Sequence, residues 1–377
     1  MHVDFAYSPR SSVGLEWELA LVDAETLELT PAAAPLLATL GADEDTPIRK
    51  EYLQSMVEIV SGAHARVSDA VADLAENLAR IRTVTDGMGI QLMGSGCHPF
   101  SQSNLQEPFH GPRYDVVKER TQWWGRQMAI CGTHIHVGVD HRDKALPITN
   151  GLARFYPLFL ALSASSPFWE GHDSGYASQR TMLFQQLPTN GLPYRMTRWE
   201  EFEAYATELT EVGMITVPAE IRWDVRPSPR FGTVENRTGD SVPTLAELGC
   251  LAALTQSLAE FIARDYEGER VVEDLPPWLV KENKWRAARY GLDAEVITPD
   301  RPQRVRPLRD YLAEWLERLT PVARDLGCEQ ELRFAETLAT RGASYERQRA
   351  VAAASNGDLR AVAALLVAET GAVTPFA

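Results

Sequence analysis

The sequence predicts an α+β fold in which a sheet-rich core is followed by a mostly helical C-terminal third. Two observations carry this prediction: apolar and polar residues alternate in several short segments before residue 240, and apolar residues recur every three or four positions after residue 244. The first pattern is typical of half-buried strands and the second of amphipathic helices. No linker or internal repeat divides the chain, so we expect one domain over 1–377, with the sheet in 1–240 and helices in 241–377.

Composition and charge limit the classes of function. The chain has 377 residues, of which 45% are hydrophobic and 24% charged, so it can bury a large core. Its formal net charge of -15 argues against a nucleic-acid partner or an anionic membrane surface, because both require clustered Lys and Arg. An anionic substrate would need help, and metal ions bound to carboxylates could provide it locally.

The four cysteines and the N-terminus predict a cytoplasmic protein. No C-x-x-C spacing occurs, and four cysteines in a chain of this length are far fewer than a disulfide scaffold contains, so we expect reduced thiols. The first residues lack the basic and apolar regions of a secretion signal. No apolar run reaches the roughly 18 residues of a membrane span, so no membrane partner is expected.

The first predicted elements are two strands that carry carboxylates. Residues 14–23 alternate with period two, which places Glu16 and Glu18 on one face. Residues 51–60 form a second predicted strand, which carries Glu58.

A helix is predicted over 68–88, with Ser68 as its N-cap and Gly89 just beyond its end, followed by a short strand over 90–94.

The middle of the chain predicts further strands with ionisable groups. After a helix over 114–128, residues 130–139 form a strand on which His134 and His136 share a face, and an apolar helix covers 151–165. A long loop then contains Arg180. The remaining predicted elements are strands over 219–226, with Glu220, Arg222, Asp224 and Arg226 on one face, and over 231–240, with Glu235 and Arg237, then helices over 244–265, 307–326 and 358–369.

Five predicted strands thus place ionisable groups on one face. Any single strand could simply present the polar side of an amphipathic antiparallel sheet to solvent. Taken together, and with glycines among the charged positions, they favour a concave sheet that faces a ligand. Carboxylate oxygens with one imidazole suit Mg2+ or Mn2+.

The histidine pair leaves other interpretations open. Two strand histidines at i and i+2 can chelate zinc or iron, and with Asp140 they would suit a zinc-dependent hydrolase. A histidine in a strand can also be a packed, hydrogen-bonded residue. The arginines suit phosphate or carboxylate recognition, although ion pairing with strand carboxylates is the alternative. No Walker loop or G-x-G-x-x-G motif occurs, so ATP would have to be held by a sheet and metals.

These residues resemble the carboxylate-amine ligases of the type 2 glutamate-cysteine ligase group, relatives of glutamine synthetase. The resemblance spans most of the chain. It departs from the family's usual pattern at Asn236, Thr238 and Gly239, which bears on substrate choice more than on fold. The matching pieces are G-L-E-W-E-L from Gly14, M-V-E-I-V-S-G from Met56, G-T-H-I-H-V-G-V from Gly132, W-D-V-R-P-S-P-R-F-G-T-V-E-N-R-T-G-D from Trp223 and N-K-W-R-A-A-R-Y-G-L-D from Asn283.

The resemblance implies a glutamine synthetase-like antiparallel sheet that forms an active-site funnel and is backed by helices. It implies catalytic or substrate-binding roles for Arg237, which would face the transferring phosphate, and for Arg226 and Arg180. Lys284 and Arg286 would touch the nucleotide, unless they simply lie on an exposed helix surface. The implied metal ligands are Glu16, Glu18, Glu58, His134 and Glu235, with Glu51 and His136 undecided.

The resemblance further implies a reaction. A substrate carboxylate, with glutamate the expected acid, attacks the terminal phosphate of ATP to give an acyl phosphate, which an amine, with cysteine expected, then captures. ATP and Mg2+ (or Mn2+) are the implied cofactors. The zinc hydrolase and a non-catalytic ligand-binding relative remain the alternatives, and the sequence leaves the oligomeric state open, a homodimer included.

Overall fold

The computed structural model describes residues 2–43, 45–109, 111, 119–268, 275–300 and 302–372. One seven-stranded sheet dominates it, in the order β2-β3-β1-β5-β9-β8, with β4 beside the far end of β1, and every pair of neighbours is antiparallel. The strands are β1 (Val13–Asp23), β2 (Ile48–Lys50), β3 (Met56–Val60), β4 (Ile90–Met93), β5 (Gly132–Gly138), β8 (Val225–Ser228) and β9 (Thr233–Asp240).

Helices and two small hairpins complete the described chain. The hairpins are β6 (Phe168–Trp169) with β7 (His172–Asp173), and β10 (Glu295–Ile297) with β11 (Val305–Pro307). Short 3-10 turns are η1 (Ser103–Leu105), η2 (Arg142–Lys144), η3 (Pro218–Glu220) and η4 (Gly291–Asp293). The helices are α1 (Ala33–Leu40), α2 (Val67–Met88), α4 (Trp123–Arg126), α5 (Ala145–Arg154), α6 (Tyr156–Ser163), α7 (Gln179–Phe184), α8 (Trp199–Glu211), α9 (Leu245–Glu267), α10 (Pro277–Tyr290), α11 (Leu308–Leu326), α12 (Glu329–Arg341), α13 (Ser344–Ala354) and α14 (Leu359–Gly371).

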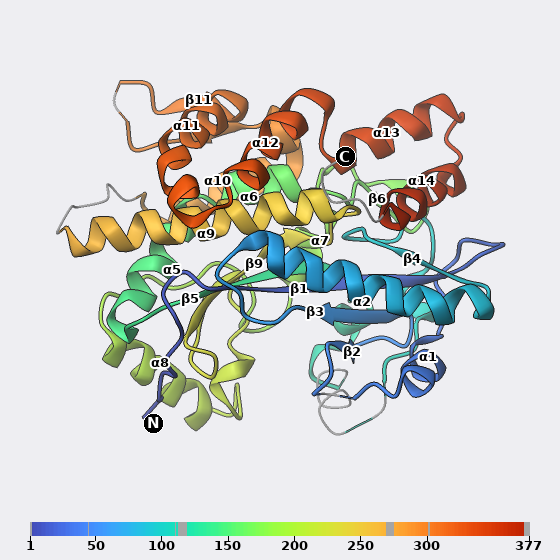
Figure 1. The fold of residues 1–377 in the computed structure, drawn as a ribbon, viewed down its shortest axis with the longest axis horizontal. Helices are drawn as coiled ribbons and strands as arrows, with labels where there is room; N and C mark the ends of the chain where they lie inside the picture. Colours follow the sequence, from blue (N-terminus) through green and yellow to red (C-terminus); the bar gives the residue numbers. More distant parts are fainter. Residues whose placement is uncertain are drawn as a thin grey trace.

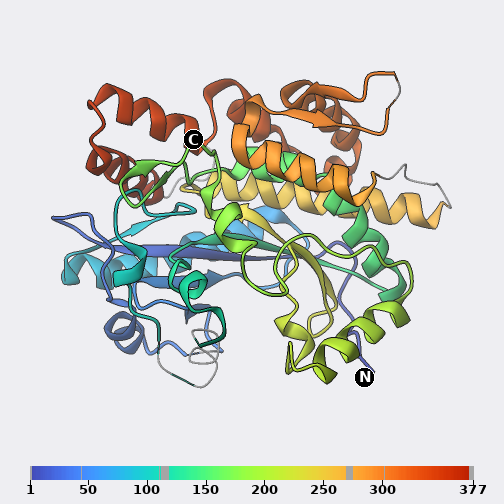
Figure 2. The same cartoon turned by 180° about the vertical axis from the view of Figure 1, so that it is seen from behind.

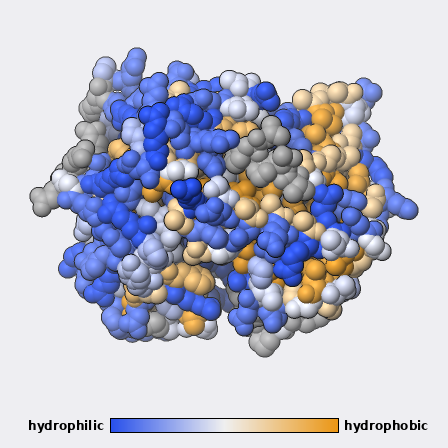
Figure 3. Space-filling view, in the orientation of Figure 1, coloured by the Kyte–Doolittle hydropathy of each residue, from blue (hydrophilic) through white to orange (hydrophobic). Residues whose placement is uncertain are grey.

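The two faces of the sheet differ because apolar residues and glutamates alternate along β1. Leu15, Trp17 and Leu19 are fully buried in the main hydrophobic core, on the face that α2 and α9 cover (Figures 1 and 2). The Trp17 indole Nε1 also donates a hydrogen bond to the carbonyl of Val242, 3.0 Å away, which satisfies its only polar atom. The opposite face carries Glu16 and Glu18. Figure 3 shows that the molecule is hollowed at its lower edge, between the part that contains α8 and the part that contains β2 and α1.

Helix α9 joins the sheet to the C-terminal helices. It begins with a capping box, in which Thr244 Oγ1 accepts from the backbone N–H of Glu247 and the Glu247 carboxylate accepts from that of Thr244. Its length and hydropathy would suit a membrane span, but 94% of the apolar window is buried within the protein, as in the central helix of a soluble fold. It packs against β5 and β1 on one side and α11 and α12 on the other.

Most of the predicted elements are confirmed within a few residues. The strand over 14–23, the helix over 68–88, the short strand at 90 and the three C-terminal helices all occur, and Gly89 ends α2 in the left-handed conformation. Helix α2 begins at Val67, and its N-cap is Arg66, two residues before the predicted Ser68. The helix predicted over 114–128 lies partly outside the described residues, and its described end contains α4.

Three predictions need correction. The strand expected over 51–60 begins only at Met56, because a turn in which the Met56 N–H donates to Leu53 precedes it. The apolar helix expected over 151–165 is instead two helices, α5 and α6, since Pro157 cannot continue a helix and occupies the first turn of the second.

The strand expected over 219–226 is wrong in its first half. Residues Pro218–Glu220 form a 3-10 turn, and the strand begins only at Val225. The backbone N–H of Asp224 donates to Gly191, and its buried side chain turns to Lys284, so the expected row of four charges on one face does not form.

His98, which lies outside the sheet, is expected to make the stability of the protein depend on pH. Its buried ring donates from Nε2 to the Leu27 carbonyl, 2.8 Å away, and accepts at Nδ1 from the backbone N–H groups of Phe100 and Ser101. Both nitrogens are thus used by the neutral ring, and burial lowers the pKa of His98 to about 4.

The unfolded chain therefore binds this proton more readily than the folded one, since a free histidine has a pKa of about 6.5. The stabilisation is complete above that value and is lost as the pH falls toward 4. We expect His98 to contribute a loss of about 2 kcal/mol in unfolding free energy between pH 7 and pH 5. Urea unfolding at both pH values would measure it. The variant His98→Gln should be less stable at pH 7 but show a smaller change with pH, and an unaltered pH dependence would refute the assignment.

Candidate active site

The register of the sheet brings ionisable side chains together on its open face. Glu16 of β1 lies opposite His134 of β5, and Glu18 lies opposite Glu58 of β3. Farther along, Glu235 of β9 is the partner of His136 on one side and of Arg226 on the other. Groups that are up to 219 positions apart in the sequence, from Glu16 to Glu235, thus form one continuous row.

Three carboxylates form the first part of this row. Glu18, Glu51 and Glu58 can each bring an oxygen within 4.8 Å of the other two. Burial, with Glu51 close by, raises the pKa of Glu18 to about 8, and burial together with Glu16 and Glu51 holds the pKa of Glu58 well above its usual range. Like charges that are buried together cannot all ionise unless a cation offsets them. Their oxygen donors are those that hard divalent cations prefer.

Glu16 connects this group to a second one. Its two oxygens lie 2.8 Å from His134 Nδ1 and 3.2 Å from His136 Nε2, and it can share a cation with Glu58 and His134 or with His136 and Glu235. Burial opposes the ionisation of Glu16, but the hydrogen bonds from both histidines outweigh it and hold the pKa of Glu16 well below its usual range. Glu16 is therefore a charged carboxylate.

His134 has one nitrogen to spare. Burial, with Arg237 close by, lowers the pKa of His134 to about 4, so the ring is neutral. Because Glu16 accepts a hydrogen bond from Nδ1, the proton is on that atom and Nε2 carries a lone pair. Nε2 is buried and has no hydrogen-bond partner, and Glu18 Oε1 lies 3.6 Å away. A lone pair directed toward a carboxylate is a poor contact, and a cation between them would satisfy both.

The arginines surround Glu235, which is fully buried. Arg226 Nε donates to Glu235 Oε2 at 2.7 Å, and Arg237 Nη1 donates to the other oxygen. Burial opposes the ionisation of Glu235, but Arg226 and then Arg237 outweigh it and hold its pKa well below the usual range. The predicted alternative, ion pairing with strand carboxylates, thus holds for these two arginines in the structure. Such pairs also keep two guanidinium groups in place beside the row.

Arg180 differs from the other two. Its side chain is only 3% exposed, yet its Nε has no hydrogen-bond partner, and its guanidinium makes no ion pair with the residues that the structure describes. It lies over the ring of Phe184, 5.4 Å from the centroid. Gly132 makes room for it, because a Cβ at that position would collide with the guanidinium.

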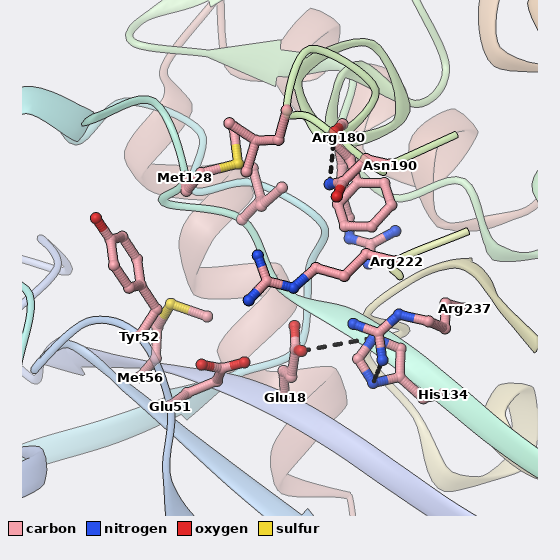
Figure 4. Close-up of a pocket in the computed structure, with 13 residues that line it drawn as sticks. Glu18, Glu51, Tyr52, Met56, Met128, His134, Arg180, Asn190, Arg222 and Arg237 are labelled. Atoms are coloured by element: carbon pink, nitrogen blue, oxygen red, sulfur yellow. Dashed lines mark hydrogen bonds and ion pairs between the residues drawn. The ribbon is translucent and has the colours of Figure 1, made fainter. Parts of the chain in front are cut away.

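A pocket of about 160 Å³ opens beside the first carboxylate group. Figure 4 shows Glu18, Glu51, His134 and Arg237 along one side of it, Met128 and Asn190 on the other, and Arg222 reaching between them. The remaining lining residues are Tyr52, Met56, Ile130, Arg180, Phe184 and Leu187. We call this cavity the arginine pocket.

A second pocket, of about 270 Å³, lies at the Glu16 and His136 end of the row. Glycines and hydroxyl groups line it, together with Arg49 and the half-exposed ring of Phe231. We call this cavity the serine pocket; its remaining lining residues are Ser8, Ser12, Gly14, Leu15, Val60, Ser61, Gly62, Ala63 and Thr233. The row of potential metal-binding groups therefore separates two cavities.

Lys284, for which the resemblance implied a nucleotide contact, has an acidic partner in the structure. Its ammonium is buried and lies 2.8 Å from Asp224 Oδ2 and 5.3 Å from the centroid of the Tyr156 ring. It is thus held inside the fold and lines neither pocket. Arg286 pairs with Glu282 one turn earlier on α10 and lines neither pocket, which agrees with an ordinary helix surface.

Asp140, which supported the zinc hydrolase, and Asn236, at which the sequence departs from the family's usual pattern, have other partners. The Asp140 carboxylate is held by Lys144 at 2.8 Å and joins none of the potential metal-binding groups found among the described residues, so the zinc hydrolase is not supported. Asn236 Nδ2 donates to Thr255 on α9, so it belongs to the covered face of the sheet and not to the funnel.

Asn190 and Arg49 are among the pocket residues that were missed from the sequence. Asn190 and Arg49 come from a loop and a short strand with no recognisable motif, and only the fold shows that they face the cavities.

Comparisons with known proteins agree with this arrangement. The family model described as "Glutamate-cysteine ligase family 2" matches residues 12–364. A protein of Arthrobacter sp. (strain FB24) named "Putative glutamate--cysteine ligase 2-1" is 49% identical over 97% of this chain and 98% of its own length. A protein of Paenarthrobacter aurescens (strain TC1) named "Putative glutamate--cysteine ligase 2-2" is 48% identical over the same shares.

Solved structures share the fold at low identity. A bifunctional glutathione synthetase from Pasteurella multocida superposes with a TM-score of 0.67 and 15% identity, over 96% of this chain and 52% of that one. The glutamate–cysteine ligase of Francisella tularensis, solved in complex with AMP, gives a TM-score of 0.61 and 13% identity, over 98% and 94% of the two chains. These similarities establish the glutamine synthetase-like fold that the sequence predicted.

Proposed function

The chain belongs to glutamate-cysteine ligase family 2, and from that premise we propose that it is an ATP-dependent ligase that joins the γ-carboxylate of glutamate to an amine, with cysteine the amine that the relatives' names suggest. One observation supports the proposal most directly. Oxygen and imidazole donors from four strands, with guanidinium groups beside them, separate two cavities on the open face of the sheet. Such a row suits phosphoryl transfer from a nucleotide in one cavity to an acid in the other.

The residues present fit divalent cations. The raised pKa values of Glu18 and Glu58 and the unpartnered Nε2 of His134 each indicate a positive charge that the protein groups alone do not supply. We propose that Mg2+ or Mn2+ ions are held by Glu16, Glu18, Glu58, His134 and Glu235, with Glu51 a further ligand, since it belongs to the group around Glu18. Bound there, the ions would neutralise phosphate oxygens and orient the triphosphate.

The proposed chemistry has two steps. A γ-carboxylate oxygen of glutamate attacks the terminal phosphorus of ATP, the new P–O bond forms, the bond to the β-phosphate oxygen breaks, and ADP leaves. The amine nitrogen then attacks the acyl carbon and loses a proton, the C–N bond forms, and the C–O bond breaks with loss of inorganic phosphate. No protein nucleophile is needed, so the protein acts by positioning and electrostatics.

The protein's own groups have separable tasks in this scheme. Arg237, held by Glu235, offers hydrogen bonds to the moving phosphoryl group, while Arg226 keeps Glu235 ionised and oriented. Arg180 and Arg222 line the arginine pocket and would hold substrate carboxylates there. The serine pocket suits the nucleotide, because Phe231 presents a ring on which a base can stack. The serine and threonine hydroxyl groups that line this pocket can bind a ribose.

We also propose that the protein is located in the cytoplasm. All four cysteines are unpaired and buried, as expected for a protein of the reducing cytoplasm, where ATP is also available.

The test is a phosphate-release assay with ATP and Mg2+, in which glutamate and other acids are paired with cysteine and other amines. We expect ADP and phosphate to form in equal amounts only when an acid and an amine are both present. Turnover without nucleotide, or ADP release that no acid or amine affects, would rule the ligase out.

Replacing either of the two strand histidines is expected to lower activity, but to different extents. His134 has a free, unprotonated Nε2 beside Glu18, whereas the Nδ1 of His136 is hydrogen-bonded to Thr233 at 2.8 Å, and its Nε2 contacts Glu16. We expect His134→Ala to lower kcat for ADP formation by about 100-fold and His136→Ala by less. Steady-state assays of both variants at saturating Mg2+ would check this, and the reverse ranking would show that His136 is the ligand.

A further inference from the structure

One wall of the arginine pocket is apolar and belongs to a hydrophobic cluster of its own. This cluster is separate from the main core and consists of six buried residues, Cys97, Met128, Ile130, Leu183, Phe184 and Leu187. Four of them, Met128, Ile130, Phe184 and Leu187, line the cavity. Because these four side chains line the cavity, the wall is available to an apolar group of a ligand.

Besides His134 Nε2 and Arg237 Nε, which belong to the row of ionisable groups, two buried polar atoms at the same pocket have no hydrogen-bond partner among the described residues. They are Nε of Arg180, a donor with a positive charge, and Oδ1 of Asn190, an acceptor. Asn190 is fixed by its Nδ2, which donates to the Phe184 carbonyl at 2.8 Å, so Oδ1 cannot exchange places with Nδ2 without losing that bond. Buried polar groups are normally satisfied, and each of these therefore indicates a ligand group of the opposite kind.

The positively charged guanidinium of Arg180 lies between the apolar wall and the polar part of the pocket. Stacking on Phe184 places the Arg180 guanidinium at the edge of the apolar wall, and Arg222 reaches across the pocket (Figure 4). The cavity thus offers two positive groups for a carboxylate, one acceptor for an amino group and a wall for an apolar side chain. An α-amino acid carries these three groups on a single carbon.

We propose that the amine substrate held in the arginine pocket is an α-amino acid whose apolar side chain is larger than that of cysteine, in the size range of leucine or methionine. This inference rests on the proposed ligase function. The carboxylate of the amine substrate pairs with Arg180 and Arg222, an N–H of its amino group donates to Asn190 Oδ1, and its side chain packs on Met128 and Leu187.

The other substrates do not account for this wall. Glutamate is charged at both ends and has only a short methylene stem between them, so it matches the polar side of the pocket, where Glu18 and Arg237 lie. Cysteine has a side chain of one carbon and one sulfur, which is too small to cover four apolar side chains. The nucleotide base has its own candidate cavity beside Phe231, across the row of metal-binding groups.

The experiment measures kcat/KM for the amine in the phosphate-release assay with ATP, Mg2+ and glutamate. The amines are leucine, methionine, cysteine, serine, aspartate and isopentylamine, which has the leucine side chain and no carboxylate. We expect leucine or methionine to exceed cysteine by about 10-fold or more, because a buried methylene alone can account for that factor. Isopentylamine should fall about 100-fold below leucine, since it has no carboxylate for Arg180 to bind.

Variants of the wall test the same inference in the protein. Leu187→Asn should lower kcat/KM for leucine by about 10-fold and remove the preference for leucine over serine. Met128→Gln, which keeps the length of the side chain, should act in the same direction if the Leu187 variant folds poorly, as judged by thermal melting. The matched control is Leu105→Asn at an exposed leucine outside this pocket, which should keep the wild-type ranking.

The experiment distinguishes failure of the proposed ligase function from failure of the proposed amine preference. If no amine stimulates ADP release with glutamate, cysteine included, the ligase function itself fails and this inference fails with it. If cysteine or serine equals or exceeds leucine and methionine, or if the wall variants keep the wild-type ranking, the ligase stands and the assignment of an apolar amine is overturned.

Discussion

Replacing Glu16 with glutamine is expected to lower kcat for glutamate-dependent ADP formation by at least about 100-fold while the protein remains folded. Glu16 stands in two of the potential metal-binding groups and accepts hydrogen bonds from both strand histidines. The amide keeps the size of the side chain but removes the charge, so it weakens cation binding and also loosens both rings. Steady-state kinetics across a magnesium titration would measure the loss, and circular dichroism would check the fold.

The matched control is Glu25→Gln, an exposed carboxylate in the turn that follows β1, which should behave as wild type. Excess magnesium should recover little of the activity of Glu16→Gln, because one negative ligand is missing whatever the ion concentration. Full activity of that variant at low magnesium would contradict the proposed metal site.

Arg237→Lys is expected to lower kcat by about 100-fold to 1000-fold, with a smaller change in the KM for ATP. Lysine keeps the charge but not the planar fork, and Arg237 uses one arm of that fork to hold Glu235. A point charge cannot both pair with Glu235 and donate to the phosphoryl group in transfer. Rapid-quench measurement of the first turnover would show whether the slow step is phosphoryl transfer.

Arg333→Lys on the solvent side of α12 provides the comparison, since Arg333 pairs only with Glu329 and Glu336 among the described residues. It should leave both constants unchanged. A wild-type first turnover in Arg237→Lys would place Arg237 outside the reaction and make it a structural partner of Glu235.

The open face of the sheet could be predicted because alternation in a strand is a local property. Glu16, Glu18, Glu58, His134 and Glu235 all lie where the period-two pattern puts them, and the antiparallel register then aligns them. The pattern failed at Asp224. Polar and apolar residues alternate in the sequence there although the backbone forms a turn at Pro218–Glu220. Only the tertiary contact with Lys284 shows that the Asp224 carboxylate faces the interior.

The apolar wall of the arginine pocket could not be predicted for a different reason. Met128 and Ile130 precede β5, whereas Phe184 and Leu187 lie at and beyond the end of α7, and in the sequence they look like ordinary core residues. Burial alone does not distinguish a side chain that packs on a neighbour from one that borders a cavity. Asn190 likewise has no motif, and it becomes informative only through an acceptor atom that has nothing to bind.

Strand β1 supplies Glu16 and Glu18 from positions two apart, while Leu15, Trp17 and Leu19 between and beside them anchor the other side of the same strand. The spacing of the two carboxylates is therefore set by the repeat of an extended backbone, about 7 Å, and not by any loop. Inserting or deleting a single residue there would exchange the positions on the open face with the buried positions along the rest of the strand. The loops of this protein can therefore tolerate insertions, whereas strand β1 can change only by substitution.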